Sequence, residues 1–427
     1  MAHIAIIGAG ITGVTTAYAL LDRGHRVTVF ERHRYPAMET SFANGGQLSA
    51  SNAEVWNHPL ALAKAVRWLF RSDAPLLLNL KPSWHKYSWL AEFIGQIPHY
   101  RNNTIATVRL ALEARRHLFA IAEREGINFD LERRGILHVY RDYRGFRHAS
   151  DVNVLLQQGG LERHAVTPDE IKSIEPTIYE NFYGGFFTPS DATGDIHKFT
   201  RGLAAACEQR GASFICDATV HEVAVNESGV TLKWRTLEQH TLEQDGDGAC
   251  EEIEADAIVI CAGVASRRFA AMLGDRVNVY PVKGYSITID LDNATSRAAA
   301  PWVSLLDDEV KIVSSRLGTD RFRVAGTAEF NGFNRDIRDL RVSPLLAWTR
   351  RLFPAVSTER VVPWMGLRPM MPNMLPRVSA GRRPGVFYNT GHGHLGWTLS
   401  AATARILAEL VETRLRSVLP IRVASFA

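Results

Sequence analysis

Cysteine is scarce in this chain, and long hydrophobic runs are absent. Only four of the 427 residues are cysteine, and no two of them have the CxxC spacing of a redox or metal motif. Four cysteines in a chain of this length are too few for a disulfide scaffold, so we expect reduced thiols and a cytoplasmic location. No apolar run reaches the roughly 18 residues that span a bilayer, and no basic leader opens the chain. We therefore expect neither a transmembrane helix nor a signal peptide.

An excess of charge of one sign is also missing. The 49 Lys and Arg residues nearly balance the 45 Asp and Glu residues, which gives a net charge of +4. A protein that binds nucleic acid electrostatically carries a basic face or stripe, and this composition argues against one. We therefore expect no nucleic-acid partner. The hydrophobic content of 46% and the length predict a globular protein of two or three domains.

Glycine is concentrated at the first turn of the chain. Residues 3–8 predict a strand, 12–23 a helix and 25–30 a second strand, which together form a βαβ unit. The turn between the first strand and the helix reads GAGITG, residues 8–13. Its first glycine permits a tight bend, its second lets the backbone approach a pyrophosphate, and its third lets the helix pack closely on the strand. The N-terminus of the helix offers free N–H groups to phosphates.

An acidic residue completes the dinucleotide-binding pattern. Glu31 lies at the end of the second strand, 18 residues after Gly13. A carboxylate at this position accepts hydrogen bonds from ribose hydroxyls and disfavours a 2′-phosphate. The glycine turn and Glu31 together predict a dinucleotide cofactor, but they do not distinguish NAD from FAD.

Three later segments favour FAD. Residues 40–47 are small and rich in hydrogen-bonding groups, residues 258–263 form an apolar strand that ends in Ala-Gly, and residues 391–398 (GHGHLGWT) place a second glycine turn before a helix. A cofactor that is contacted from four distant segments is long and deeply buried, as permanently held FAD is. The candidate FAD-binding residues are Gly8, Gly10, Ile11, Thr12, Gly13, Glu31, Arg32, Ser41, Asn44, Gly45, Gly46, Gln47, Leu48, Val220, Ala262, Gly263, Gly391, Gly393, His394, Leu395, Gly396, Trp397 and Thr398. No cluster of metal ligands accompanies the two histidines of 391–398, so we expect no metal site.

Six motifs spread over nearly the whole chain carry a family resemblance. They are GAGITG, ETSFANGGQLS, TGDIHKFTRGLA, YPVKGYSITI, GLRPMMP and NTGHGHLGWTLS. In this order they resemble the FAD-dependent D-amino acid dehydrogenases of the bacterial small-subunit type, within the glycine oxidase and D-amino acid oxidase superfamily. The resemblance implies oxidation of a D-amino acid to an imino acid, which hydrolyses to a 2-oxo acid and ammonia.

The resemblance also implies a mixed α/β fold made of two interleaved domains. We expect a Rossmann-like FAD-binding domain and a substrate-binding domain built on a large mixed β-sheet. The predicted FAD-binding segments are 1–58, 190–275 and 360–427. The predicted substrate-binding segments are 59–189 and 276–359.

Three residues are candidates for catalysis or substrate binding. By resemblance, Arg368 of GLRP holds the substrate carboxylate, because a planar guanidinium offers two parallel N–H donors; the alternative is a structural ion pair. Tyr285 of KGYS is a candidate second carboxylate contact or a packing residue. His394 stands where the family usually has a small hydroxyl residue, and residues 371–374 (MPNM) replace the usual Thr-Pro-Asp-Gly. These departures leave open a cyclic or N-methyl amino acid, such as proline, hydroxyproline or sarcosine, as substrate.

The partners of the chain remain open at several points. We expect an amino acid substrate and a quinone or other respiratory electron acceptor, with an oxygen-dependent oxidase, a FAD-bearing subunit of a larger complex and a redox-sensing flavoprotein as alternatives. Residues 59–80 mix apolar side chains with Lys64, Arg67 and Arg71. Such a segment is typical either of a core-facing helix or of peripheral contact with the inner membrane. The oligomeric state is not predicted.

Overall fold

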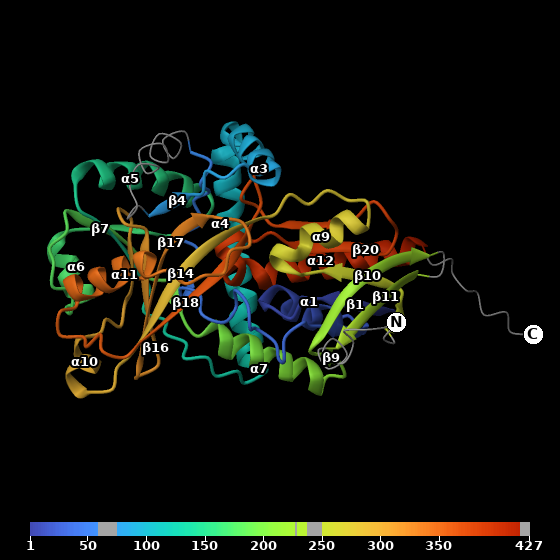
Figure 1. Cartoon of the computed structure of the whole chain (residues 1–427). Coiled ribbons are helices and arrows are strands. Elements are labelled where there is room, and N and C mark those ends of the chain that lie inside the picture. The colour runs from blue at the N-terminus through green and yellow to red at the C-terminus, as the bar shows by residue number, and fades with distance from the viewer. Residues whose placement is uncertain (59–74, 227–228, 237–249, 419–427) are drawn as a thin grey trace, which may run out of the picture.

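The computed structural model describes residues 1–58, 75–226, 229–236 and 250–418 (Figure 1). Within these residues the chain forms two large sheets, which lie on opposite sides of the molecule in Figure 1 and are flanked by helices. Segments from both ends and from the middle of the sequence meet in each half, so the polypeptide crosses between the two sheets repeatedly.

The first large sheet is the nucleotide-binding type that the N-terminal pattern predicts. In the described residues it has six strands in the order β19-β20-β13-β1-β2-β9, parallel except for β19. Its strands are β1 (His3–Ile7), β2 (Arg26–Phe30), β9 (Ser213–Ile215), β13 (Ala257–Ile260), β19 (Arg377–Ala380) and β20 (Val386–Thr390). All five residues of β1 are buried, because both faces of this sheet are covered.

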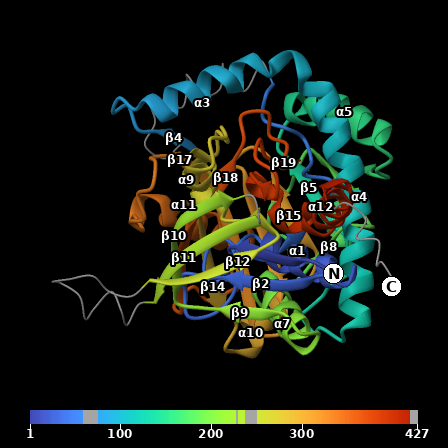
Figure 2. The ribbon, with the colours of Figure 1, turned by 90° about the vertical axis from the view of Figure 1, so that its right-hand side faces the viewer.

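Alternate residues of β1 pack against different layers. Ile4 and Ile6 join a core formed with helices, whereas Ala5 and Ile7 join a core formed with a second, three-stranded sheet. The helices are α1 (Ile11–Leu21), α4 (Tyr100–Arg124), α7 (Ile196–Gln209) and α12 (Gly396–Val418). The other layer contains β10 (Ala218–Asn226), β11 (Gly229–Thr236), β12 (Glu251–Ala255) and α9 (Ser266–Met272). Figure 2 shows α1, α4 and α12 close together, in agreement with the packing of α12 on both α1 and α4.

The second large sheet is mixed and has nine strands in the described residues. Eight follow the order β18-β14-β17-β16-β15-β5-β7-β6, and β4 pairs with β17. They are β4 (Leu76–Leu78), β5 (Ile136–Tyr140), β6 (His164–Val166), β7 (Gly184–Thr188), β14 (Tyr280–Asp290), β15 (Ser304–Asp307), β16 (Ile312–Leu317), β17 (Arg321–Phe330) and β18 (Val361–Met370). Helix α11 (Asp339–Leu352) packs on one face through Leu345 and Trp348.

Short elements connect these layers. They are the strand pair β3 (Gln47–Leu48) and β8 (Ala192–Thr193), the helices α3 (Trp84–Gly95), α5 (Tyr143–Gln158), α6 (Pro168–Ile174) and α10 (Ala294–Ala299), and the 3-10 turns η1 (Ile97–His99), η2 (Gly263–Ala265) and η3 (Gly393–Leu395). The predicted fold class, a Rossmann-like layer combined with a large mixed sheet, is confirmed.

Strand β18 shows where the predicted segments and the sheets differ. It lies in the predicted FAD-binding segment 360–427, yet it hydrogen-bonds along β14 in the nine-stranded sheet. If the sheets are used to divide the chain, the predicted boundary at residue 360 is therefore too early. Pairing with the distant strand β14 places β18 in the nine-stranded sheet. The division into two domains remains a prediction.

The amphipathic segment 59–80 lies outside the described residues, apart from its last six positions. Of these, Leu76–Leu78 form β4. Among the described helices, none is long and apolar enough to cross a bilayer. The four cysteines are free thiols, as expected for reduced residues.

Candidate functional site

A cavity of about 910 Å³ is lined by residues from both large sheets. Every predicted FAD-binding residue lines it except Gly13, Gly46 and Leu48. The predicted substrate residues Arg368, Tyr285 and His394 line it as well. The structure therefore brings the glycine turn, residues 40–47, residues 258–263 and the stretch 391–398 together around one space.

The glycine turn needs its glycines for the reasons that the sequence suggests. Gly8 has φ +103°, and a Cβ there would lie 2.7 Å from the Cys261 carbonyl oxygen. A Cβ on Gly13 would lie only 1.8 Å from the Gly8 carbonyl oxygen. Gly13 thus allows the close approach of α1 to the turn and does not itself line the cavity. The N-cap of α1 is Gly10, which has no side chain that could occupy the N–H groups of the first turn, so this end of the helix is suited to a phosphate group.

Glu31 closes the turn from the end of β2. Its Oε2 accepts a hydrogen bond from the Ala9 N–H at 2.8 Å, and its Oε1 accepts one from the His33 N–H at 3.0 Å. Burial raises the pKa of this carboxyl, while the two backbone donors act in the opposite direction. Arg32 also lines the cavity and forms an ion pair with Glu39. These contacts hold an acidic group beside the glycine turn, where the dinucleotide pattern places one.

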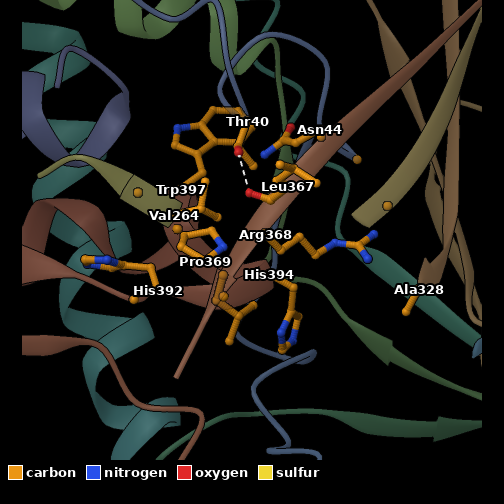
Figure 3. Close-up of a pocket in the computed structure, with 18 of the residues that line it drawn as sticks. Thr40, Asn44, Val264, Ala328, Leu367, Arg368, Pro369, His392, His394 and Trp397 are labelled. Atoms are coloured by element: carbon orange, nitrogen blue, oxygen red, sulfur yellow. Dashed lines mark hydrogen bonds between the residues drawn. The ribbon is translucent and has the colours of Figure 1, made fainter. Parts of the chain in front are cut away.

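The segment 40–47 connects the nucleotide half to the mixed sheet. The Ser41 hydroxyl accepts a hydrogen bond from the Ile11 N–H at 3.0 Å, and the Thr40 hydroxyl donates to the Leu367 carbonyl at 3.0 Å (Figure 3). Gly46 has φ +72° and packs against Ser315, whereas Leu48 is buried in β3. The last two residues therefore shape the segment without facing the cavity.

The late glycine turn separates its two histidines. His392 points away from Arg368 in Figure 3, and its Nε2 lies 2.9 Å from the Thr403 hydroxyl. His394 lies near Arg368 and stacks on Trp56, with ring centroids 5.0 Å apart. Burial lowers the pKa of His394 to about 4, and the positive charges of Arg368 and Lys311 act in the same direction. His394 is therefore neutral near pH 7. Among the described residues no group of three or more metal-ligating side chains occurs.

Arg368 extends from β18 into the cavity (Figure 3). One guanidinium nitrogen donates to the Thr327 carbonyl at 2.9 Å. A Cβ on Gly284 would lie 2.3 Å from the same guanidinium, so the glycine of KGYS makes room for the arginine to cross β14. In the described part of the chain no carboxylate forms an ion pair with Arg368, and burial alone lowers its pKa to about 10. The guanidinium remains charged near pH 7 and can receive an anionic ligand group.

A bulge in β17 aims the Thr327 carbonyl at Arg368. The pairing of β14 with β17 shifts register between Lys283 and Tyr285, and Thr327 has φ +58° at this point. A non-glycine residue in the left-handed region is uncommon, and a bulge is one place where it occurs. Neither the bulge nor the contact with Arg368 is visible in the local sequence.

Tyr285 lies on the other face of β14. Its hydroxyl donates to Glu329 at 2.9 Å and its ring packs in the core beneath α11, although the residue contributes to the cavity wall. Side chains alternate along a strand, so Tyr285 points away from the Gly284 face on which Arg368 lies. The geometry favours a packing role for Tyr285 over a contact with the substrate carboxylate.

Sequence reasoning missed several polar residues of the cavity wall. His138 of β5 contacts the Ser51 hydroxyl at 2.8 Å, and Lys311 forms an ion pair with Asp308 in the turn between β15 and β16. All four line the cavity. The alternation of β5 was a signal for His138, but nothing local indicated that Lys311 would face the same space as Arg368.

Comparison with known proteins gives the family. Residues 3–410 match the FAD dependent oxidoreductase family, DAO. This chain belongs to that family. It is 62% identical over 97% of its length to a D-amino acid dehydrogenase 3 from Mesorhizobium japonicum, of which the match covers 98%. It is 39% identical over 96% of its length to a D-amino acid dehydrogenase from Dechloromonas aromatica, of which 97% is covered.

Solved structures with low sequence identity share the fold. Glycine oxidase from Geobacillus kaustophilus superposes with a TM-score of 0.75 at 22% identity, over 97% of this chain and 96% of that one. L-proline dehydrogenase from P. horikoshii gives 0.73 at 16% identity, over 96% and 93%. The family fixes FAD as the cofactor, and the glycine turn at the start of α1, Glu31 and the size of the cavity fit it.

Proposed function

We propose that this protein oxidises D-amino acids to 2-oxo acids and ammonia with FAD as hydride acceptor. The observation that carries the proposal is a charged guanidinium, Arg368, that faces the FAD cavity without a carboxylate partner among the described residues. The similarity to D-amino acid dehydrogenases over nearly the whole chain supports it.

Arg368 would hold the substrate α-carboxylate through two parallel N–H donors. Binding this group fixes the direction of the Cα–H bond, and orientation is the main requirement that the protein must meet for hydride transfer. FAD supplies the acceptor for the two electrons and the hydrogen that leave Cα. The substrate ammonium loses one proton to solvent before the hydride leaves Cα, and water then hydrolyses the resulting imino acid to the 2-oxo acid and ammonia.

His394 would contribute a neutral, flat wall to the substrate space. An uncharged imidazole does not repel the substrate ammonium, and its stacking on Trp56 fixes the plane of the ring. The predicted FAD-binding residues that line the cavity would hold the cofactor. Gly13, Gly46 and Leu48 would act by shaping the turns that those residues occupy.

A cyclic or N-methyl amino acid is the second candidate substrate class. The stacked pair of Trp56 and His394 lies beside Arg368 and offers an aromatic surface, which suits an apolar ring such as that of proline or hydroxyproline. The carboxylate would still bind Arg368, so the two classes share one mode of recognition.

The electron acceptor that we propose is a quinone or another respiratory acceptor. The protein would then act in the cytoplasm, with peripheral contact to the inner membrane where quinones are held. This part rests on the dehydrogenase names of the relatives.

A panel of amino acids tests the function. The purified FAD-loaded protein is assayed by dye reduction with D- and L-amino acids, proline, hydroxyproline and sarcosine, and hydrogen peroxide is measured in parallel. We expect turnover of D-amino acids without stoichiometric peroxide. Turnover of cyclic or N-methyl compounds alone would select the second candidate, and stoichiometric peroxide would replace the dehydrogenase with an oxidase.

A further inference from the structure

The cavity contains a second charged group close to Arg368. Lys311 lies in the turn between β15 and β16, lines the cavity, and has 47% of its side-chain surface accessible. The strand order places this turn two strands from β14, where the Arg368 guanidinium crosses Gly284. At the usual spacing between strands this separation is about 10 Å. The carbonyl of Lys311 lies next to Gly326, the neighbour of the residue that binds Arg368.

The side chain of His394 lies within the electrostatic reach of both Arg368 and Lys311. The positive charges of both Arg368 and Lys311 contribute to the lowered pKa of His394, so each is near enough to the imidazole to act on it. An amino acid whose carboxylate binds Arg368 and whose side chain passes His394 would reach Lys311. Among the described residues, Lys311 is the only lysine that lines this cavity.

The charges around Lys311 are balanced. Its ammonium forms an ion pair with Asp308. Glu54 and Arg163 also line the cavity; Glu54 acts electrostatically on Lys311, and Arg163 donates to the hydroxyl of Tyr140, which also acts on Lys311. A carboxylate in the substrate side chain would be repelled by Asp308 and Glu54. An ammonium in the substrate side chain would be repelled by Lys311 and Arg163. The Lys311–Asp308 pair instead presents hydrogen-bond donors and acceptors side by side.

We propose that Lys311 and Asp308 form the side-chain subsite and select D-amino acids with a neutral hydroxyl or carboxamide. The ammonium of Lys311 donates to the oxygen of that group, and the carboxylate of Asp308 accepts from its O–H or N–H. An aliphatic side chain fills the same space without making these bonds. The inference rests on the proposed oxidation of D-amino acids and adds the substrate class.

The backbone of Lys311 allows a clean test. Its φ is +54°, a left-handed conformation that asparagine adopts more readily than lysine. Lys311→Asn removes the ammonium and shortens the side chain without adding strain to the turn. Asp308→Asn removes the other charge. The matched control is Lys233→Asn, since Lys233 of β11 pairs with Glu222 of β10 and does not line the cavity.

The experiment compares kcat/KM for two sets of substrates with FAD-loaded enzyme. For D-asparagine, D-glutamine, D-serine and D-threonine we expect each cavity variant to lose about 10- to 100-fold, the usual cost of one hydrogen bond to a charged group. For D-alanine and D-valine we expect changes below about threefold, with the loss for the first set appearing mainly in KM. Flavin content and the thermal midpoint are measured for every variant to detect misfolding.

Four outcomes would overturn the subsite. An equal loss for both sets would mean that the pair only stabilises the turn, and no loss for either set would mean that it does not meet the substrate. A wild-type enzyme that oxidises D-alanine but not the polar D-amino acids would remove the subsite and leave the proposed function. An enzyme without activity on any D-amino acid would remove both.

Discussion

The two ends of the cavity are built in different ways. At the nucleotide end the chain uses backbone geometry, with the turn at residues 8–13, which includes the start of α1 at Ile11. At the substrate end it uses strand pairing: the Arg368 side chain crosses Gly284 and donates to the Thr327 carbonyl, and these residues come from three strands that are distant in sequence. A site made from one turn depends on local conformation, whereas a site made across strands depends on register.

The sharpest contrast is expected for Gly13→Ala. The new Cβ would lie 1.8 Å from the Gly8 carbonyl oxygen, which is backbone and cannot rotate away. Forcing the helix from the strand should lower the free energy of unfolding by about 3 kcal/mol or more and abolish FAD retention. Urea unfolding and flavin absorbance of the purified variant would measure both effects.

The control for this variant is Gly95→Ala at the end of α3. No atom lies within 4 Å of a Cβ at that position, so stability should be unchanged or slightly raised. A Gly13→Ala protein that purifies with full flavin would show that α1 can move, and that the nucleotide end is less constrained than the contact distance indicates.

At the substrate end, Arg368→Met should leave FAD bound and lower kcat/KM for every D-amino acid by about 100- to 1000-fold, the usual cost of removing one partner of a buried charge pair. Gly284→Ala should do the same to a smaller extent, because its Cβ would lie 2.3 Å from the guanidinium and displace it. Steady-state kinetics with D-alanine would measure both, and Arg382→Met, an exposed arginine, is the control.

An Arg368→Met enzyme with unchanged KM for all amino acids would remove the carboxylate role. If only Gly284→Ala were silent, the guanidinium would have room to shift and still bind the carboxylate. The two variants therefore distinguish the charge of Arg368 from its position.

A smaller effect is expected for Glu31→Ala at the nucleotide end. The carboxylate receives two backbone hydrogen bonds and would meet the ribose of FAD. FAD affinity should fall by about 10- to 100-fold, since hydrogen bonds to a charged group are lost, while KM for substrate should not change. Fluorescence titration of the apoprotein with FAD would measure the affinity. Full flavin occupancy after dialysis would contradict the ribose assignment.

The contrast between the two ends also explains what the sequence could predict. The βαβ unit, the glycine turn and Glu31 follow from residues within one short stretch, so their positions could be inferred. Three features depend instead on the pairing of β14, β17 and β18. They are the contact of Arg368 with Thr327, the face of β14 on which Tyr285 lies, and the position of Lys311 near Arg368 in the cavity. One bulge in β17 changes the register there, and no local sequence pattern predicts this bulge. The family resemblance supplied the role of Arg368 but not these neighbours.

The smallest effect concerns the late glycine turn and has a pH dependence with a definite sign. His392 is 3% exposed, its Nδ1 has no hydrogen-bond partner among the described residues, and burial lowers its pKa to about 3. In the unfolded chain the pKa of a histidine is about 6.5. Between these values the unfolded state binds the extra proton, so the free energy of unfolding falls as the pH falls below about 6.5, by up to roughly 1.4 kcal/mol per pH unit.

His392→Gln should reduce this pH dependence, because glutamine does not titrate and its amide can still reach the Thr403 hydroxyl. Urea unfolding of the FAD-loaded protein would give the free energy of unfolding at pH 7 and at pH 5. We expect the decrease between pH 7 and pH 5 to be smaller in the variant than in the wild type by about 2 kcal/mol. His164→Gln on the exposed strand β6 is the control and should keep the wild-type difference. An equal difference in the His392→Gln protein would mean that this end of the cavity opens before His392 titrates, and that the helix start after the late turn is held less firmly than that of α1.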